Sequence, residues 1–161
     1  MLVVLAVPAS LLVRRAVGGR DGVDPLHSGP APAFTRPTLD GGTVSLIDLR
    51  GRPVVVNFWG SWCPQCRDEL PLLARSAQRH PEVAFLGVLF RDKPDDARKA
   101  AGQAGAGFPM LLDPGETAAR AYGVESAPVT FFITGDGTIA GDLIGPVTGP
   151  LIEKLVKRAS R

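Results

Sequence analysis

The feature that most constrains the fold of this chain is a strongly β-forming segment that runs directly into two closely spaced cysteines. Residues 53–59 read PVVVNFW, a β-branched and aromatic run typical of a central strand buried on both faces. Residues 63–79 carry apolar side chains at the i, i+3, i+4, i+7 spacing of a helix. Cys63 and Cys66 therefore lie where a buried strand passes into the first turn of a helix.

Strand and helix signals alternate along the rest of the chain. Strands are predicted over residues 43–46, 83–90, 129–134 and 138–144. Helices are predicted after a cap at Asp95 or Asp96, over residues 116–122, and after a cap at Thr148. This order predicts an α/β domain with one mixed central sheet. The strands at 53–59 and 83–90 should be parallel, and the last two strands should form a hairpin.

The length of 161 residues suits one domain with a core of its own. Residues 1–17 contain an apolar run that ends at two arginines, and we interpret them as a partial signal or membrane-anchor segment. A disordered apolar start is the alternative. Residues 18–33 have the Gly and Pro content of a linker, which places the folded domain at residues 34–161. No apolar run approaches the roughly 18 residues of a membrane-spanning helix.

Charge and cysteine content exclude several classes of protein. From Phe34 onward, 15 Lys and Arg stand against 14 Asp and Glu without a basic run, which argues against a nucleic-acid partner. With only two cysteines, a disulfide-rich scaffold and an all-cysteine zinc site within one chain are excluded. Half of a zinc site shared between two chains, or a purely structural disulfide, are the alternatives left open for the pair.

The position of the cysteines favours thiol–disulfide exchange. The start of a helix carries partial positive charge and free N–H groups, which should lower the pKa of Cys63 below that of a free cysteine. Cys66 lies one turn further on, close enough to form a disulfide with Cys63. We therefore expect Cys63 to be the exposed attacking thiol and Cys66 the more buried resolving thiol. Pro64 suits the first turn, where its missing N–H costs nothing.

Residues 57–71, NFWGSWCPQCRDELP, resemble the active-site segment of thioredoxin-like proteins, and most of all that of the extracytoplasmic TlpA/ResA/CcmG (DsbE) group. Residues 31–49 resemble the N-terminal hairpin of that group, and residues 123–133 resemble the segment with its cis-proline. The resemblance spans residues 30–158. It implies a thioredoxin-like fold, with a mixed central sheet flanked by helices and an N-terminal hairpin extension.

The resemblance also implies which residues bind the substrate. Pro128 would be the cis-proline that faces the cysteines; an ordinary trans proline at the start of a strand is the alternative. Pro71 matches a proline that bends the active-site helix, unless the helix ends at Leu70. We expect Trp59 to be packed in the core. The substrate-binding residues implied are Trp62, Pro64, Ala127 and Pro128.

Glu69, three residues after Cys66, matches a glutamate that influences thiol titration in ResA-like members. The candidate catalytic residues are therefore Cys63, Cys66 and Glu69, with Glu69 accepting the proton of Cys66; the alternative for Glu69 is a solvated charge on an exposed face. Asn57 stands where cytoplasmic thioredoxins carry a buried aspartate, and an amide does not titrate in this range. Val129 stands where many CcmG-like members have glutamate, which favours the ResA/TlpA side.

We expect an extracytoplasmic thiol–disulfide oxidoreductase, secreted or membrane-tethered, that reduces cysteine pairs of protein substrates such as apocytochrome c before haem attachment. Because the chain has no third cysteine, a membrane thiol electron donor or acceptor must recycle the pair. We expect a monomer that needs no metal or cofactor beyond its redox-active cysteine pair.

Three other functions are alternatives for a chain with this cysteine pair. The same pair could work as an oxidant that forms disulfides in exported proteins, since direction depends on its reduction potential. A copper carrier would suit thiolate chemistry, but the related copper chaperones space their cysteines one residue further apart and use a distal histidine. Cysteine peroxidases place Thr or Ser three residues before the reactive cysteine, where this chain has Gly60.

Overall fold

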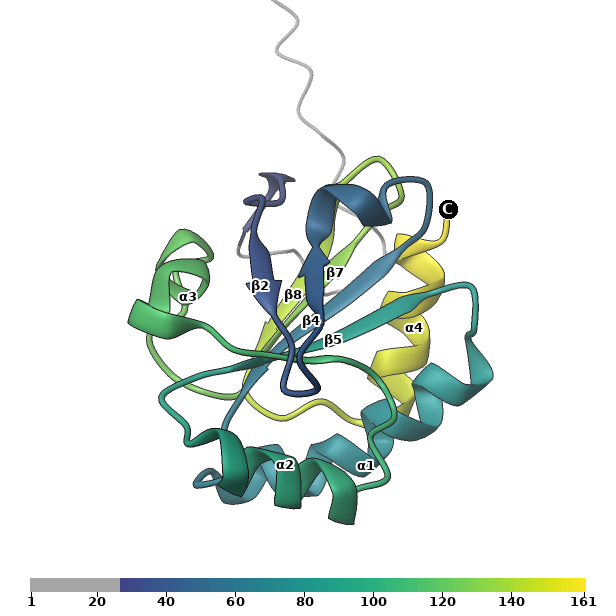
Figure 1. Ribbon diagram of the computed structural model, residues 1–161. Coiled ribbons are helices and arrows are strands. Elements are labelled where there is room, and N and C mark those ends of the chain that lie inside the picture. Colours follow the sequence, from purple (N-terminus) through teal and green to yellow (C-terminus); the bar gives the residue numbers. More distant parts are fainter. Residues whose placement is uncertain (1–26) are drawn as a thin grey trace, which may run out of the picture.

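The computed structural model describes residues 27–161, whose backbone forms a six-stranded sheet with helices on both faces (Figure 1). The strands of this sheet are β1 (Gly29–Pro30), β4 (Val54–Trp59), β5 (Ala84–Leu89), β6 (Met110–Leu111), β7 (Val129–Ile133) and β8 (Thr138–Ile144). They lie in the order β1-β8-β7-β4-β5-β6. The pairs β4–β5 and β5–β6 are parallel and the other three are antiparallel, so the sheet is mixed as predicted.

A separate two-stranded hairpin precedes the central strands. Its strands, β2 (Thr35–Pro37) and β3 (Thr43–Ser45), are antiparallel, and the 3₁₀ helix η1 (Leu46–Leu49) follows them. The hairpin is joined to the sheet edge at β6, where the N–H of Leu112 donates to the carbonyl oxygen of Pro37 at 2.9 Å. The predicted N-terminal hairpin extension is confirmed.

The helices divide between the two faces of the sheet. On one face, α1 (Pro64–Arg79), α2 (Pro94–Gln103) and α4 (Gly149–Ala159) cover the sheet. On the other, α3 (Thr117–Ala121), preceded by the 3₁₀ helix η2 (Pro114–Glu116), packs beside the hairpin. The fold is thus the predicted α/β arrangement, with β4 between β5 and β7 at its centre.

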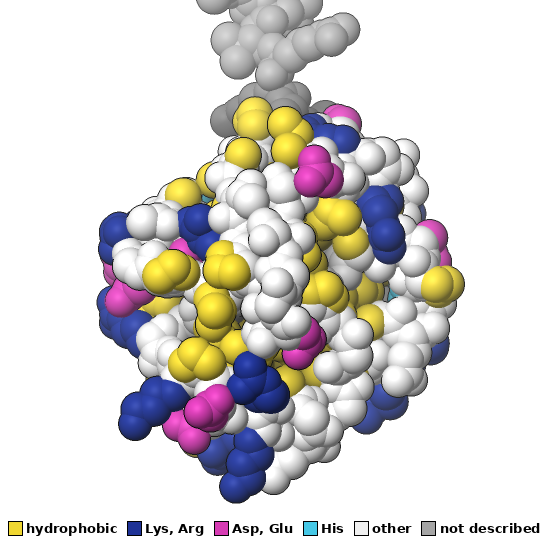
Figure 2. Space-filling model, in the orientation of Figure 1, with side chains coloured by type: hydrophobic (Ala, Val, Ile, Leu, Met, Phe, Trp, Pro, Cys, Tyr) yellow, Lys and Arg dark blue, Asp and Glu magenta, His cyan; other side chains and the backbone are white. Residues whose placement is uncertain are grey.

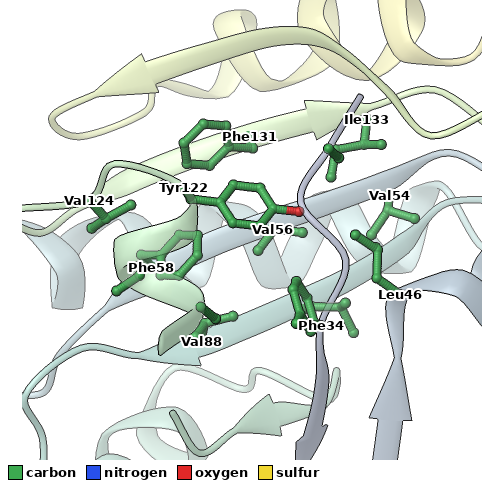
Figure 3. Packing of buried hydrophobic residues seen from close by; sticks show 14 of the residues in the cluster. Phe34, Leu46, Val54, Val56, Phe58, Val88, Tyr122, Val124, Phe131 and Ile133 are labelled. Carbon is green, nitrogen blue, oxygen red and sulfur yellow. The ribbon is translucent and has the colours of Figure 1, made fainter. Parts of the chain in front are cut away.

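Alternation along β4 sends its side chains to both layers. Val54, Val56 and Phe58 pack in a cluster with the hairpin and α3, which Figure 3 shows around the Tyr122 ring. The Tyr122 ring lies 5.4 Å from that of Phe58, centroid to centroid. Successive strand side chains point to opposite faces, so residues 55, 57 and 59 face α1 instead. All six β4 residues are buried, which confirms a central strand covered on both sides.

The N-terminal boundary differs from the one expected from composition. Gly29 and Pro30 pair with β8, and the N–H of Ala31 donates to the carbonyl oxygen of Gly137 at 2.9 Å. Ordered structure therefore begins before Phe34. The backbone of residues 29–31 forms hydrogen bonds along the edge of the sheet at β8, although its composition is that of a linker. The predicted segment 1–17 and the linker up to residue 26 lie outside the described residues.

One of the predicted helix caps differs from the structure. The N-cap of α2 is Lys93, and Asp95 and Asp96 lie in the first turn, because Pro94 already occupies the first helical position. Thr148 is the N-cap of α4 as predicted, but its side chain makes no capping hydrogen bond. Pro71 lies inside α1, so the alternative that this helix ends at Leu70 is wrong.

The surface carries charges of both signs. On the face shown in Figure 2, Lys and Arg side chains lie around the edge, with Asp and Glu beside several of them, and apolar side chains lie between. Among residues 27–161, no helix is both long enough and apolar enough to cross a membrane.

Candidate active site

The two cysteines lie at the start of α1, directly beyond the end of β4. Cys63 is the N-cap residue of α1, and its Sγ accepts the backbone N–H of Cys66 at 3.1 Å. A disulfide joins the pair, whose Cα atoms are 5.2 Å apart. Pro64 occupies the first helical turn as predicted. The same N–H and the helix terminus would stabilise negative charge on Cys63 Sγ once the pair is reduced.

Both cysteines are buried in the disulfide form. Cys63 is 4% exposed and Cys66 is fully covered. The order of exposure agrees with the expected roles, but the expectation of an exposed Cys63 is wrong for this state. The reason is its surroundings, since Cys63 Sγ lies 3.8 Å from the carbonyl oxygen of Ala127 and Cys63 belongs to an apolar cluster that includes Trp59 and Leu70.

The segment before β7 faces the cysteines. The peptide bond between Ala127 and Pro128 is cis, which confirms the prediction for Pro128. Ala127 is half-buried, and its carbonyl oxygen lies 3.8 Å from Cys63 Sγ. The carbonyl oxygen of Pro128 accepts the N–H of Gly145 at 2.9 Å, which fixes this segment against the end of β8. Backbone groups of residues 127 and 128 therefore lie beside the reacting sulfur.

Two tryptophans flank the loop before Cys63 and differ in exposure. Trp59 is fully buried, as expected for a packing residue. Trp62 is 51% exposed, although its Nε1–H donates to the carbonyl oxygen of Phe90 at 3.1 Å. A Cβ atom at Gly60 would overlap the Trp62 ring, so a larger residue there would force the ring to move. Trp62 thus presents an anchored apolar surface next to the cysteine pair.

Asp92 holds the same loop, a role that the sequence did not reveal. Its carboxylate accepts the Ser61 N–H at 2.5 Å and the Ser61 hydroxyl at 2.8 Å. It also accepts the N–H of Lys93 at 2.8 Å. Arg67, for which the sequence suggested no role, donates to the carbonyl oxygen of Ser61 at 3.2 Å. The only sequence signal for Asp92 is its place just after a buried strand. Because that strand is parallel to β4, its carboxyl end lies at the same end of the sheet as Cys63.

Glu69 is buried beneath the pair, so the alternative of a solvated surface charge is wrong. It is 1% exposed, and its Oε1 accepts Asn57 Nδ2–H at 2.8 Å while its Oε2 accepts the Val147 N–H at 2.8 Å. Burial raises the pKa of Glu69 from 4.5 to about 7, and the bonds from Val147 and Asn57 oppose that rise. A buried carboxyl that titrates near neutral pH thus lies one helical turn from Cys66.

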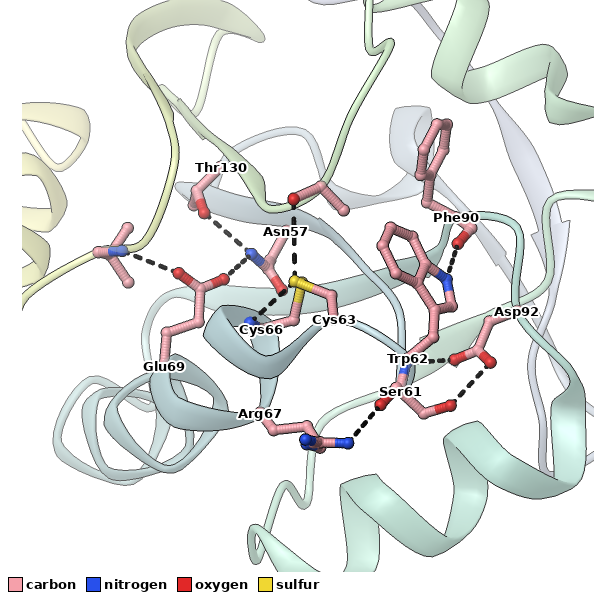
Figure 4. The surroundings of a disulfide bond; sticks show 12 residues. Asn57, Ser61, Trp62, Cys63, Cys66, Arg67, Glu69, Phe90, Asp92 and Thr130 are labelled. Carbon is pink, nitrogen blue, oxygen red and sulfur yellow. Dashed lines mark hydrogen bonds between the residues drawn. A yellow bond between two sulfur atoms is a disulfide. The ribbon is translucent and has the colours of Figure 1, made fainter.

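The structure brings the predicted site residues together at the end of the sheet where β4 passes into α1. Cys63, Cys66 and Glu69 come from α1, Trp62 from the loop before it, and the cis-proline segment from the start of β7 (Figure 4). The arrangement supplies two sulfurs in bonding distance at a helix N-terminus, a buried carboxyl one helical turn from Cys66, and the backbone of residues 127 and 128 beside Cys63. Those are the parts that thiol–disulfide exchange requires.

Comparison with known proteins agrees with this geometry. Residues 28–141 match the AhpC/TSA family. The chain is 34% identical over 130 residues to the thiol-disulfide oxidoreductase ResA of Bacillus thuringiensis (strain Al Hakam), which covers 80% of this chain and 75% of that protein. It is 34% identical over 146 residues to the thiol:disulfide interchange protein DsbE of Allochromatium vinosum, covering 89% of this chain and 80% of that protein.

A solved structure shows the same fold. The thiol:disulfide interchange protein of the thioredoxin family from Chlorobium tepidum TLS matches with a TM-score of 0.76 and 25% sequence identity, over 84% of this chain and 99% of that chain. The fold is therefore thioredoxin-like, with the cysteine pair at the position that the sequence predicted. The chain belongs to the AhpC/TSA family and is a thiol–disulfide oxidoreductase of the ResA and DsbE type, with Cys63 and Cys66 as its redox pair.

Proposed function

We propose that the protein works outside the cytoplasm as a reductant of protein disulfides, with the oxidised Cys-x-x-Cys-His segment of an apocytochrome c as its substrate class. The observation that carries the proposal is the position of Cys63 Sγ, at a helix N-terminus and 3.8 Å from the Ala127 carbonyl oxygen. A peptide extended along residues 127 and 128 would bring its own disulfide to that sulfur. The direction, the substrate and the location are supported by the resemblance to the ResA-like group.

The reaction proceeds in two exchanges. The Cys63 thiolate attacks one sulfur of the partner disulfide, so that a mixed disulfide forms and the partner's other sulfur leaves as a thiolate. Cys66 then passes its proton to Glu69 and attacks Cys63 Sγ. The bond between Cys63 and the partner breaks, the partner leaves with both cysteines reduced, and the Cys63–Cys66 disulfide remains. Two electrons have moved from the pair to the partner.

Regeneration needs a second partner. Each turnover leaves the chain oxidised, and its sequence contains no further cysteine that could return electrons. We propose that a membrane protein with its own dithiol reduces the pair by the reverse exchanges. The monomer would then alternate between substrate and donor, using the same Cys63 sulfur for both.

The test uses the full chain and a disulfide-closed Cys-x-x-Cys-His peptide. The reduced protein should open the peptide disulfide and become oxidised, and the potential of the pair should lie near the roughly −270 mV of thioredoxin. The Cys66→Ser variant should stall as a mixed disulfide with the peptide, whereas Cys63→Ser should form none. If the oxidised protein instead closes the reduced peptide, and its potential lies near the roughly −120 mV of a strong oxidant, the proposed direction is wrong.

Location has its own test. A membrane-impermeant maleimide added to intact cells should label Cys63 of the reduced protein before lysis. Labelling that requires lysis would place the protein inside the cytoplasm and contradict the proposal.

A further inference from the structure

In the side-chain amide of Asn57, in the middle of β4, the nitrogen has hydrogen-bond partners among residues 27–161 and the oxygen has none. Its Nδ2 group donates both hydrogens, to Glu69 Oε1 at 2.8 Å and to Thr130 Oγ1 at 2.9 Å. Its Oδ1 is buried and has no hydrogen-bond partner among residues 27–161. Asn57 as a whole is 1% exposed. A buried carbonyl oxygen without a donor loses its hydrogen bonds to water and gains none in return, so this oxygen destabilises the disulfide form of the protein.

The unpartnered oxygen lies on the side of the cysteine pair. Asn57 shares its face of the sheet with Trp59, which packs in one cluster with Cys63 and Cys66. Figure 4 shows the Asn57 amide between the Glu69 carboxyl and the cysteines, with its nitrogen toward Glu69 and its oxygen toward the sulfur atoms. An ionised Glu69 carboxylate can only accept, so it holds the amide nitrogen toward itself and leaves the oxygen on the side of the cysteines.

In the disulfide form the cysteines provide no hydrogen-bond donor for Asn57 Oδ1. Neither sulfur carries a hydrogen, and the backbone N–H of Cys66 already donates to Cys63 Sγ. Reduction changes this, because a thiol is a hydrogen-bond donor, though a weak one. Of the two sulfurs, that of Cys66 is the one fully enclosed in the disulfide form, in one cluster with Trp59 of β4.

We propose that Asn57 is a positioning residue whose Oδ1 accepts a hydrogen bond from the Cys66 thiol only when the pair is reduced, so that Asn57 selectively stabilises the reduced protein. The balanced step is ordinary exchange. Two partner thiols lose two electrons and two protons and form a disulfide, and the Cys63–Cys66 bond breaks. Cys66 Sγ takes up one proton, which then points at Asn57 Oδ1, and the other goes to Cys63 Sγ or to the solvent. The inference concerns the pair itself and holds whichever direction the protein works in.

The first test is the reduction potential of Asn57→Leu, which keeps the branching at Cγ and removes the oxygen. Because the variant no longer buries an unsatisfied oxygen when oxidised, its disulfide should be favoured about tenfold over that of the native protein in glutathione buffers, a potential about 30 mV more negative. The measurement is made at about pH 8, above the pKa of Glu69 at about 7, so that in the native protein the ionised carboxylate holds the amide in this orientation.

The matched control is Thr130→Val, which removes the other acceptor of the same amide but leaves Oδ1 in place. Its potential should stay near the native value. An unchanged or less negative potential for a folded Asn57→Leu, or an equal shift in both variants, would overturn the proposal.

The second test needs no variant. Asn57 is the only asparagine in the sequence, so asparagine labelled with ¹³C at Cγ marks this one carbonyl. In the infrared spectrum of the labelled protein, that band should move to lower wavenumber on reduction, because the oxygen gains a hydrogen bond. A Cys66→Ala control, which has no thiol there, should keep the band where the oxidised protein has it. A band at the same position in both redox states would disprove the bond.

Discussion

The backbone N–H of Val147 donates to Glu69 Oε2 at 2.8 Å, which links the active-site helix to the segment just before α4. Glu69 is thus held from two sides, by this bond and by the one from Asn57. Both bonds favour the ionised carboxylate, yet burial outweighs them and the pKa rises to about 7. Burial of this charge should therefore lower the free energy of unfolding at pH values where Glu69 is ionised.

Stability should fall as pH rises through the range where Glu69 ionises. A carboxyl whose pKa is 4.5 when unfolded and about 7 when folded keeps its full contribution below pH 4.5 and loses it as pH approaches 7. Relative to Glu69→Gln, the free energy of unfolding of the native protein should therefore drop by roughly 3 kcal/mol across this window and level off above it. Urea unfolding of the oxidised proteins between pH 4 and pH 9 measures the difference.

The exposed neighbour Asp68 provides the control, since Asp68→Asn changes a carboxyl on the same helix outside the core. A difference curve for Glu69→Gln that is flat with pH would show that Glu69 does not titrate in this window.

The rate of the second exchange should depend on the same ionisation. In the native protein, the step in which Cys66 displaces the partner should accelerate as pH rises through about 7, because ionised Glu69 accepts the Cys66 proton. In Glu69→Gln this inflection should disappear, and the step should be roughly 100-fold slower above it. Stopped-flow release of a fluorescent partner from the preformed mixed disulfide follows the step directly. A native pH profile in the variant would remove Glu69 from the proton transfer.

The sequence predicted the parts of the site that depend on local order along the chain. The Cys63–Cys66 spacing, the strand before it and the helix after it are neighbours in sequence, and the cis-proline follows from a motif at residues 123–133. The fold class followed from the alternation of strand and helix signals, and the structure confirms it.

The parts that escaped prediction are contacts between distant elements. Nothing local shows that Asn57 bridges Glu69 and Thr130, since those residues lie on three different elements. The role of Asp92 could not be predicted, because its partner Ser61 is 31 positions away. The covering of Cys63 depends on the backbone carbonyl oxygen of Ala127. The position of a backbone atom cannot be predicted from the pattern of side chains.

Trp62 should matter for protein partners and not for small ones. Its half-exposed ring lies beside the cysteine pair without taking part in the exchange chemistry. Trp62→Ala should lower kcat/KM roughly tenfold for a protein disulfide, through lost interface contact, and leave the reaction with a small-molecule disulfide unchanged. Ile47→Ala is the control, because Ile47 is also exposed and apolar but lies on η1. Equal losses with both kinds of substrate would mean that Trp62 acts on the cysteines themselves.

Asp92 should stabilise the loop in which Trp62 lies beside the cysteines. Its carboxylate accepts three hydrogen bonds, two from Ser61 and one from Lys93, and Asp92→Ala leaves these donors without their acceptor. We expect a loss of about 2 kcal/mol in the free energy of unfolding, together with faster hydrogen exchange at the Ser61 amide. Asp95→Ala is the matched control, since the Asp95 side chain is 96% exposed and its pair with Arg98 should be worth at most about 0.5 kcal/mol. If Asp92→Ala cost no more than Asp95→Ala and left the Ser61 amide protected, the loop would be held by the Trp62–Phe90 bond and the packing around it rather than by Asp92.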